Sequence, residues 1–144
     1  MTLARDLAIL LARIGIGAVF IAHGWQKLVT NGVDGTAGFF GSVGIPLPTA
    51  AAWFAALLEV GGGAALILGL LTPVFGVLLA LNMLGAYVFV HAGKGMFVAD
   101  GGAELVLALG VGALMIAAVG AGRFSVDALL TPMVRRRTAE PATA

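Results

Sequence analysis

Four long apolar stretches, each with few or no charged residues, run along the chain. They cover residues 7–28, 50–71, 74–92 and 103–120. A helix rises 1.5 Å per residue, so about 20 residues cross the roughly 30 Å hydrocarbon core of a bilayer. The pattern therefore predicts an all-α fold, an integral membrane bundle of four helices.

The connections between these stretches differ in length. Only Thr72 and Pro73 separate the second stretch from the third, which predicts a tight antiparallel hairpin. The first connection, residues 29–49, mixes aromatic residues with glycines and prolines. We expect it to fold back onto the mouth of the bundle. Residues 1–128 are predicted to form one four-span domain, followed by a basic cytoplasmic tail at 129–144.

Composition supports a membrane environment. Of the 144 residues, 60% are hydrophobic and only 10% are charged, and the mean hydropathy is +1.08. A soluble domain of this size has no interior large enough to hide so much apolar surface. The net charge of +1 gives no reason to expect a nucleic-acid partner. Because there is no cysteine, a redox role needs a partner or a diffusible cofactor.

The basic residues predict the orientation. One side of the predicted bundle carries five arginines with Arg13 close by, whereas the other carries only Lys27 and Lys94. Lysine and arginine are in excess in cytoplasmic loops, so we expect both termini on the cytoplasmic side of a bacterial plasma membrane. The five arginines are Arg5, Arg123, Arg135, Arg136 and Arg137.

The segment after the fourth stretch has a different character. Ser125 precedes Val126 and Asp127, an order typical of an N-cap that starts a short amphipathic helix. The arginines at 135–137 would then lie against anionic lipid head groups, or serve only as a topology anchor.

Glu59 lies alone within the second stretch. A carboxylate at the bilayer centre costs about 3 kcal/mol or more, so it should face a partner or a wet cavity. Helix rise places Arg13 about 9 Å, Glu59 about 13 Å and Asn82 about 12 Å from the ends of their stretches. We therefore expect an Arg13–Glu59 ion pair completed by Asn82. Such a triad either only fixes helix register or contains a carboxylate that handles a proton or orients a ligand.

A second polar layer is expected at the outer mouth. His23 and Lys27 share a helix face, as do His91 and Lys94. Two histidines and a carboxylate can bind iron or zinc, but the spacing is wrong and two lysines oppose a cation, so we expect no metal. Histidines near a membrane surface more often serve as interfacial hydrogen-bonding groups. The other reading is a ligand site, and since lysine and imidazole donate to oxygen, its ligand would be an anion or a quinone head group. The candidate ligand-binding residues are His23, Lys27, Glu59, His91, Lys94 and Glu104.

Small residues recur at helical spacing on two of the stretches. Gly61, Ala65 and Gly69 form one stripe, and Ala108 and Gly112 form another. Stripes of this kind let helices approach closely in lipid, so we expect these residues to pack helices together.

Several motifs occur in an order that resembles the DoxX family of small four-helix membrane proteins. They read RIGIGAVFIAHGWQK, FFGSVGIP, EVGGG, GGAE and GAGRFSVD along the chain. The positions that match the family pattern are Arg13, Gly17, Phe20, Gly24, Lys27, Phe40, Gly44, Ile45, Pro46, Glu59, Gly62, Gly63, Glu104, Gly120, Gly122, Ser125 and Asp127.

The resemblance implies a membrane subunit associated with an oxidoreductase assembly linked to thiol, thiosulfate or quinone redox chemistry. It implies no intrinsic cofactor and a quinone as the diffusible one. The expected partners are membrane lipids, a soluble or membrane oxidoreductase, and in one arrangement further copies of the chain. The alternative is a non-enzymatic membrane scaffold or a carrier of a small molecule or lipid. The resemblance assigns no catalytic residue, so whether the chain itself catalyses a reaction stays open.

Overall fold

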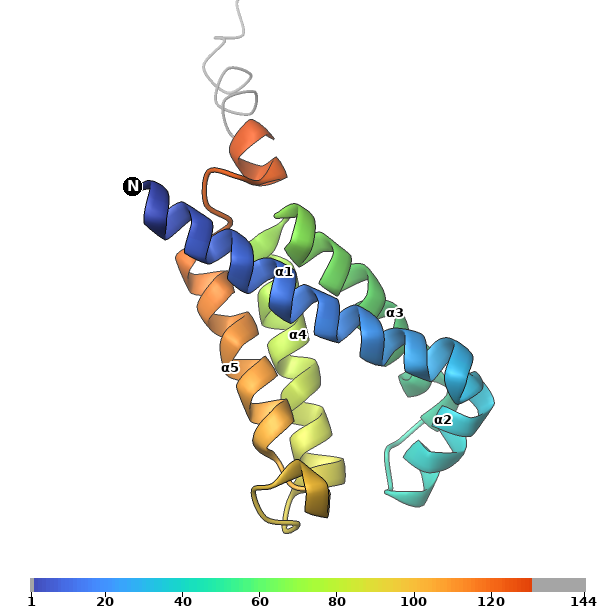
Figure 1. The fold of residues 1–144 in the computed structure, drawn as a ribbon. Coiled ribbons are helices and arrows are strands. Elements are labelled where there is room, and N and C mark those ends of the chain that lie inside the picture. Colours follow the sequence, from blue (N-terminus) through green and yellow to red (C-terminus); the bar gives the residue numbers. More distant parts are fainter. Residues whose placement is uncertain (1, 131–144) are drawn as a thin grey trace, which may run out of the picture.

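The computed structural model describes residues 2–130, and these residues form helices joined by turns (Figure 1). The predicted all-α class is confirmed, since no strand occurs within that range. The main helices are α1 (Leu3–Trp25), α2 (Gly32–Ser42), α3 (Pro48–Leu68), α4 (Thr72–Ala86) and α5 (Glu104–Val119).

Three helical segments within residues 2–130 are long and apolar enough to cross a bilayer. They are Leu3–Thr30, Pro48–Leu68 and Thr72–His91. The first and third combine α1 and α4 with the π-helical turns η1 (Gln26–Thr30) and η2 (Tyr87–His91). The predicted fourth span corresponds to α5, which has 16 residues and is shorter than the others. Four spans therefore stay a prediction.

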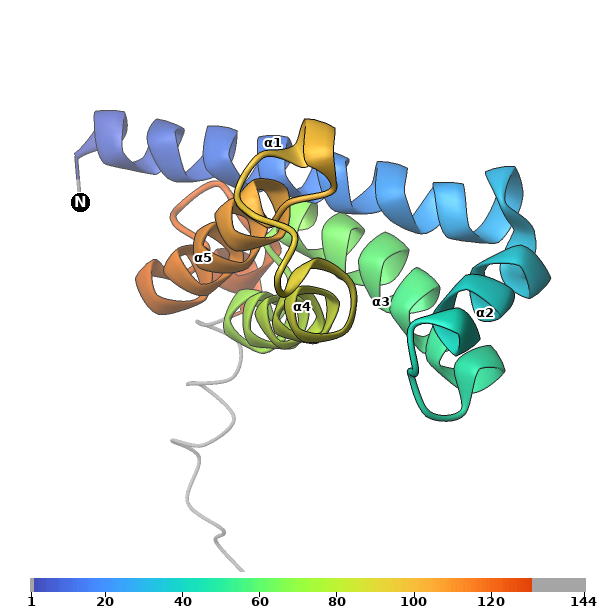
Figure 2. The ribbon, with the colours of Figure 1, turned by 90° about the horizontal axis from the view of Figure 1, so that it is seen from below.

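The helices associate as two antiparallel pairs. α1 packs along α3, and α4 packs along α5. The two pairs diverge toward the end of the molecule that lies opposite the N-terminus (Figure 1). α2 packs against α3 (Figure 2). The expected folding back of residues 29–49 is thus confirmed, although the segment is largely helical rather than a loop.

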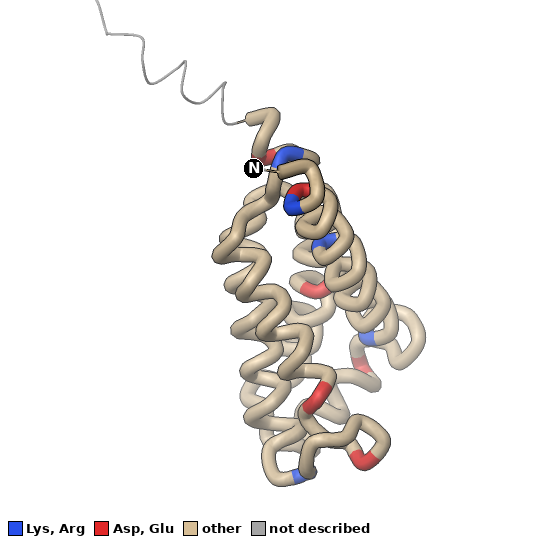
Figure 3. Tube along the Cα trace, turned by 60° about the vertical axis from the view of Figure 1, so that its left-hand side comes forward, with Lys and Arg blue, Asp and Glu red and all other residues tan. Residues whose placement is uncertain are grey.

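An apolar layer fills the middle of the molecule. It is a cluster of buried side chains to which α1, α3, α4 and α5 all contribute. Most charged residues lie nearer the two ends (Figure 3). We call the end that holds the N-terminus and the α3–α4 turn the Arg13 end, and the opposite end the Lys27 end. Both described ends of the chain lie at the Arg13 end (Figure 1). The members of the apolar layer are Phe20, Leu66, Leu79, Met83, Leu109, Ala113 and Ile116.

The α1–α3 crossing is a backbone contact. A Cβ atom added to Gly17 would lie 2.6 Å from the carbonyl oxygen of Gly63, and one added to Gly63 would lie 2.6 Å from that of Gly17. The predicted stripe is wrong at Gly61, where no atom outside its own helix lies within 4 Å of such a Cβ. Hydropathy does not show which of three consecutive glycines faces the partner helix.

Gly63→Ala is therefore expected to destabilise the protein by about 1–3 kcal/mol, because the added methyl group must push α1 away from α3. Gly61→Ala is the matched control on the same helix. It should be neutral or stabilising by up to about 1 kcal/mol through helix propensity. Thermal unfolding in detergent, followed by circular dichroism, compares the two. Equal midpoints would show that the crossing tolerates a methyl group.

Arg13 joins the end of α3 to the segment after α5. Its side chain is 1% exposed, and it donates to Leu66 O at 2.8 Å and Ile67 O at 2.8 Å, in the last turn of α3. It also donates to Phe124 O at 3.0 Å and to Ala121 O, just beyond α5. The last carbonyls of a helix lack intrahelical partners and form the negative end of its dipole, so a guanidinium group is stabilising there.

The expected Arg13–Glu59 pair is therefore wrong. Arg13 and Lys27 are separated by 14 positions on one continuous helical segment, or about 21 Å at 1.5 Å per residue. Glu59 lies at the level of Lys27. The π-helical turn η1 extends the helix to Thr30 and brings Lys27 inside the bundle rather than leaving it at the mouth.

The segment after α5 is fastened to the α3–α4 turn. The Asp127 carboxylate accepts from Leu71 N at 2.8 Å and Thr72 N at 3.0 Å, at the start of α4. Ser125 Oγ accepts from Ala128 N at 3.2 Å, so its predicted N-cap role is confirmed. The arginines at 135–137 lie outside the described residues.

Candidate functional site

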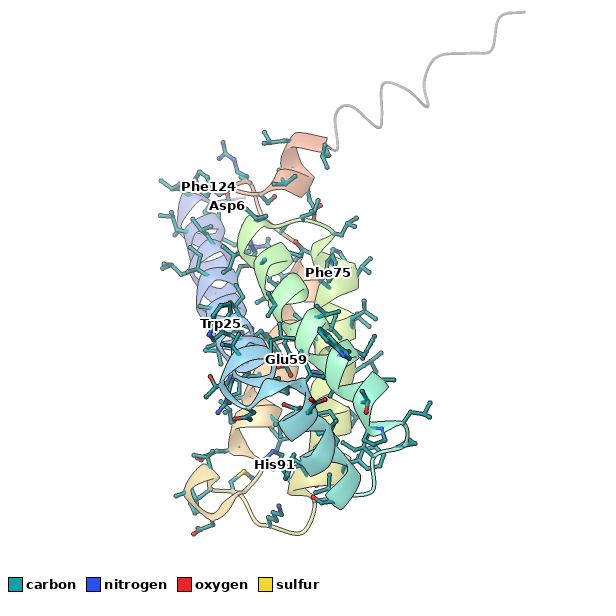
Figure 4. The ribbon with its side chains drawn as sticks, turned by 90° about the vertical axis from the view of Figure 1, so that its right-hand side faces the viewer. Asp6, Trp25, Glu59, Phe75, His91 and Phe124 are labelled. Atoms are coloured by element: carbon teal, nitrogen blue, oxygen red, sulfur yellow. The ribbon has the colours of Figure 1, made fainter. Side chains whose placement is uncertain are left out.

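Glu59 is held in the interior by two side chains from other helices. It is 2% exposed, and its Oε2 accepts from Lys27 Nζ at 2.6 Å. Its Oε1 accepts from Asn82 Nδ2 at 2.9 Å, as expected for Asn82. Figure 4 shows Glu59 between the helices, well away from Asp6 and Phe124. A paired and hydrogen-bonded carboxylate of this kind is the arrangement that makes a buried charge tolerable.

Two π-helical turns carry side chains that lie near Glu59. η1 follows α1 and contains Lys27, while η2 follows α4 and ends at His91. An i→i+5 turn is rare, and its extra residue rotates the side chains that follow, so such turns are frequent at functional sites. Nothing in the apolar pattern of the sequence indicated either turn.

Three ionisable side chains from different helices line one cavity of about 270 Å³. They are His23 of α1, Glu59 of α3 and His91 of η2. We call it the histidine cavity. The remaining walls are apolar and consist of Phe20, Met83, Val98, Leu105, Val106 and Leu109.

Both imidazole rings are anchored through Nδ1. His23 Nδ1 lies 2.9 Å from Val19 O, and His91 Nδ1 lies 2.7 Å from Gly101 O. A carbonyl oxygen only accepts, so the proton is assigned to Nδ1 in each ring. The neutral rings then present Nε2 as an acceptor, and neither Nε2 has a hydrogen-bond partner within residues 2–130.

Glu59 also lines a second hollow, of about 320 Å³. We call it the α3–α4 groove. Glu59 and Asn82 are its polar lining residues, and Glu59 is common to both hollows. A ligand bound in either hollow therefore lies beside the same carboxylate. The other groove residues are Phe40, Ile45, Ala51, Phe54, Ala55, Leu78, Leu81, Gly85, Ala86, Phe89 and Val90.

The other predicted site residues lie apart from the cavity. Lys94 is exposed beyond the end of η2. Glu104 is the first residue of α5 and accepts from Val98 N at 2.8 Å, so it holds the connecting segment in place. Lys27 touches Glu59 but lines neither hollow. Across residues 2–130, no group of three or more His, Cys, Asp or Glu side chains is placed to hold a metal ion.

Sequence reasoning missed the apolar part of the site. Phe20 and Met83 form walls of the histidine cavity although neither was a candidate. A signal was available for Phe20, which lies three positions before His23 and therefore shares its helix face.

Comparisons with known proteins agree with the membrane fold. The DoxX family profile matches residues 8–92. "Putative oxidoreductase CatD" of Bacillus subtilis (strain 168) is 39% identical over 90 residues, which are 62% of this chain and 64% of that protein. "Inner membrane protein YphA" of Escherichia coli (strain K12) is 36% identical over 88 residues, 61% of each chain. The match thus spans slightly less than two thirds of both relatives. No solved structure matches the chain.

A third relative is aligned over nearly its whole length. "Inner membrane protein YqjF" of Escherichia coli (strain K12) is 34% identical over 134 residues, 88% of this chain and 94% of that protein. The family profile includes α1, α3 and α4, and with them Arg13, Lys27 and Glu59. Together with the long apolar helices, these similarities identify the chain as a multi-pass membrane protein of the bacterial plasma membrane that belongs to the DoxX family.

Proposed function

We propose that this protein is the membrane subunit of an oxidoreductase assembly and that it binds a quinone head group in the histidine cavity. The observation that carries the proposal is the convergence of His23, Glu59 and His91 on one cavity. Ionisable side chains inside a membrane bundle are costly, and they mark ligand or proton sites. The name of one relative, "Putative oxidoreductase CatD", supports a redox context.

In the proposed chemistry, this chain handles the protons and its partner handles the electrons. A quinone takes up two electrons and two protons to become a quinol. The chain has no cysteine, so the partner oxidoreductase exchanges the electrons. His23 and His91 accept or return protons at Nε2.

The proposal places α5 across the membrane as the fourth span. Its 16 residues extend about 24 Å at 1.5 Å per residue, close to the thickness of the hydrocarbon core. With four spans, both termini lie on one side, and the arginines at the Arg13 end make that side cytoplasmic. The histidine cavity then lies in the outer half of the bundle.

Native mass spectrometry of the protein extracted gently from its own membrane tests this function. The wild type is compared with Glu59→Gln, which keeps the side-chain shape and removes the charge. We expect a quinone or an oxidoreductase partner to co-purify with the wild type and to be lost in the variant. Circular dichroism of the same samples checks that the variant is folded. A protein that carries neither ligand nor partner would contradict the proposal.

The α3–α4 groove favours one alternative, a carrier of a lipid or another apolar small molecule. Eleven of its thirteen lining residues are apolar or glycine. A carrier that uses only this apolar surface does not need the Glu59 charge. The same experiment separates the two functions, because a lipid retained equally by wild type and Glu59→Gln would support the carrier.

A further inference from the structure

The polar side chains that line the two hollows offer mainly acceptors to a ligand. They are His23, Glu59 and His91 in the histidine cavity, and Glu59 and Asn82 in the groove. Each imidazole uses its Nδ1 proton on a backbone carbonyl, which leaves Nε2 as an acceptor in the neutral ring. The ionised Glu59 carboxylate has no proton to donate.

Asn82 extends this arrangement into the groove. An ionised carboxylate only accepts, so the amide must turn its NH₂ toward Glu59. The Asn82 carbonyl oxygen is left without a donor among the described residues 2–130. An amide oxygen inside a membrane bundle gains most from a ligand that brings a hydroxyl group.

The only lysine near these acceptors is already engaged. Lys27 Nζ donates to Glu59 Oε2 and lines neither hollow. A ligand that carries two carbonyl oxygens therefore meets acceptors at His23, Asn82 and His91 when both rings are neutral. A ligand that carries two hydroxyl groups finds partners for both of them.

The groove suits the apolar part of such a ligand. Phe40, Phe54 and Phe89 lie along it, and Gly85 opens its α4 side. A side chain added at Gly85 meets nothing within 4 Å outside its own helix. Glu59 lines both hollows, so a ligand whose head group lies beside Glu59 has the apolar groove next to it for its tail.

We propose that the site binds a hydroquinone, the reduced form of the ligand, with its hydrocarbon tail in the α3–α4 groove. This inference rests on the proposed function and specifies the form and the pose of its ligand. The hydroxyl groups donate to the acceptors around Glu59, and the tail packs between α3 and α4.

The first test compares oxidation states. Equilibrium dialysis with the full chain in lipid nanodiscs, against empty nanodiscs as the blank, measures the affinity for decylubiquinol and for decylubiquinone. We expect the quinol to bind about tenfold more tightly, a difference of about 1.4 kcal/mol. A chemical reductant keeps the quinol reduced, and it cannot alter thiols in a chain that has none. Equal affinities, or tighter binding of the quinone, would overturn the inference about the reduced form.

The second test concerns the tail. Gly85→Phe should fill the groove and lower the affinity for decylubiquinol about tenfold, while leaving the affinity for the tailless hydroquinone unchanged. Leu84→Phe is the matched control, since Leu84 is exposed on the same helix and lines a different hollow. Unchanged binding of decylubiquinol to Gly85→Phe would overturn the tail site.

The outcomes separate the inference from the function on which it rests. If quinone and quinol bind equally well and Gly85→Phe has no effect, the inference is wrong and the proposed function stands. If the wild type binds no quinol or quinone of any tail length, the proposed function itself is wrong. If Gly85→Phe displaces a bound phospholipid but leaves the binding of decylubiquinol unchanged, the groove holds an acyl chain. That outcome would contradict the tail site.

Discussion

Arg13→Met is expected to destabilise the protein by about 3–5 kcal/mol, because it leaves buried carbonyl oxygens without their donor. Four backbone carbonyls, from the end of α3 and from the segment after α5, accept from this one side chain. A thioether fills part of the volume but donates nothing. The midpoint of thermal unfolding in detergent should fall by about 10 °C or more.

Arg13→Lys separates charge from geometry. A lysine keeps the positive charge near the end of α3 but has a single ammonium group, whereas guanidinium spreads five N–H donors over a rigid plane. We expect it to recover less than half of the lost stability. Limited proteolysis adds a local readout, with faster cleavage near residues 120–125 in both variants. A Lys variant as stable as the wild type would show that charge alone is sufficient at this position.

Lys27→Met should cost about 3–5 kcal/mol, because it leaves the Glu59 carboxylate buried with only Asn82 beside it. Lys27 is 19% exposed whereas Glu59 is 2% exposed, so the partner that remains is the more deeply buried of the two. Unfolding in detergent, measured under the same conditions as for the Arg13 variants, gives the loss.

The double variant Lys27→Met with Glu59→Leu tests the cause. Removing both charges leaves only the Asn82 amide to satisfy, so most of the lost stability should return. The double-mutant cycle then gives the coupling between the two side chains. If the double variant is no more stable than Lys27→Met, the loss does not arise from the unpaired carboxylate. Ligand binding should be lost in both variants, which separates stability from function.

The sequence contained enough information to place the helices and the buried glutamate. Hydropathy found α1, α3, α4 and α5 and the short turn between α3 and α4. It also identified Glu59 as a buried charge that needs a partner, and Asn82 as a hydrogen-bond donor to it. These inferences succeed because the pattern of apolar residues and the cost of a buried charge are both properties of the chain alone.

The partner of Glu59 could not be found in this way. Helix rise gives only the depth of a residue along its span. It does not show which helices are neighbours or which faces they turn to one another. The partners of Arg13 are backbone carbonyls, which every residue carries and no motif marks. Lys94 was expected beside His91, but the chain leaves the helix at Ala92, with ψ near 126°. The convergence of His23 and His91 depends on how the α1–α3 pair packs against the α4–α5 pair, which hydropathy does not describe.

The apolar layer divides the molecule electrically as well as structurally. Phe20, Leu79 and Ala113 are fully buried within it, and such a dry layer has a low dielectric constant. In a membrane most of the voltage falls across the region that excludes water and ions, and a full crossing is worth about 2.3 kcal/mol per elementary charge per 100 mV. The histidine cavity lies on the Lys27 side of this barrier. Under the proposed function, protons that move between the cavity and the Lys27 end therefore do little work against the membrane potential, because the apolar layer separates them from the Arg13 end.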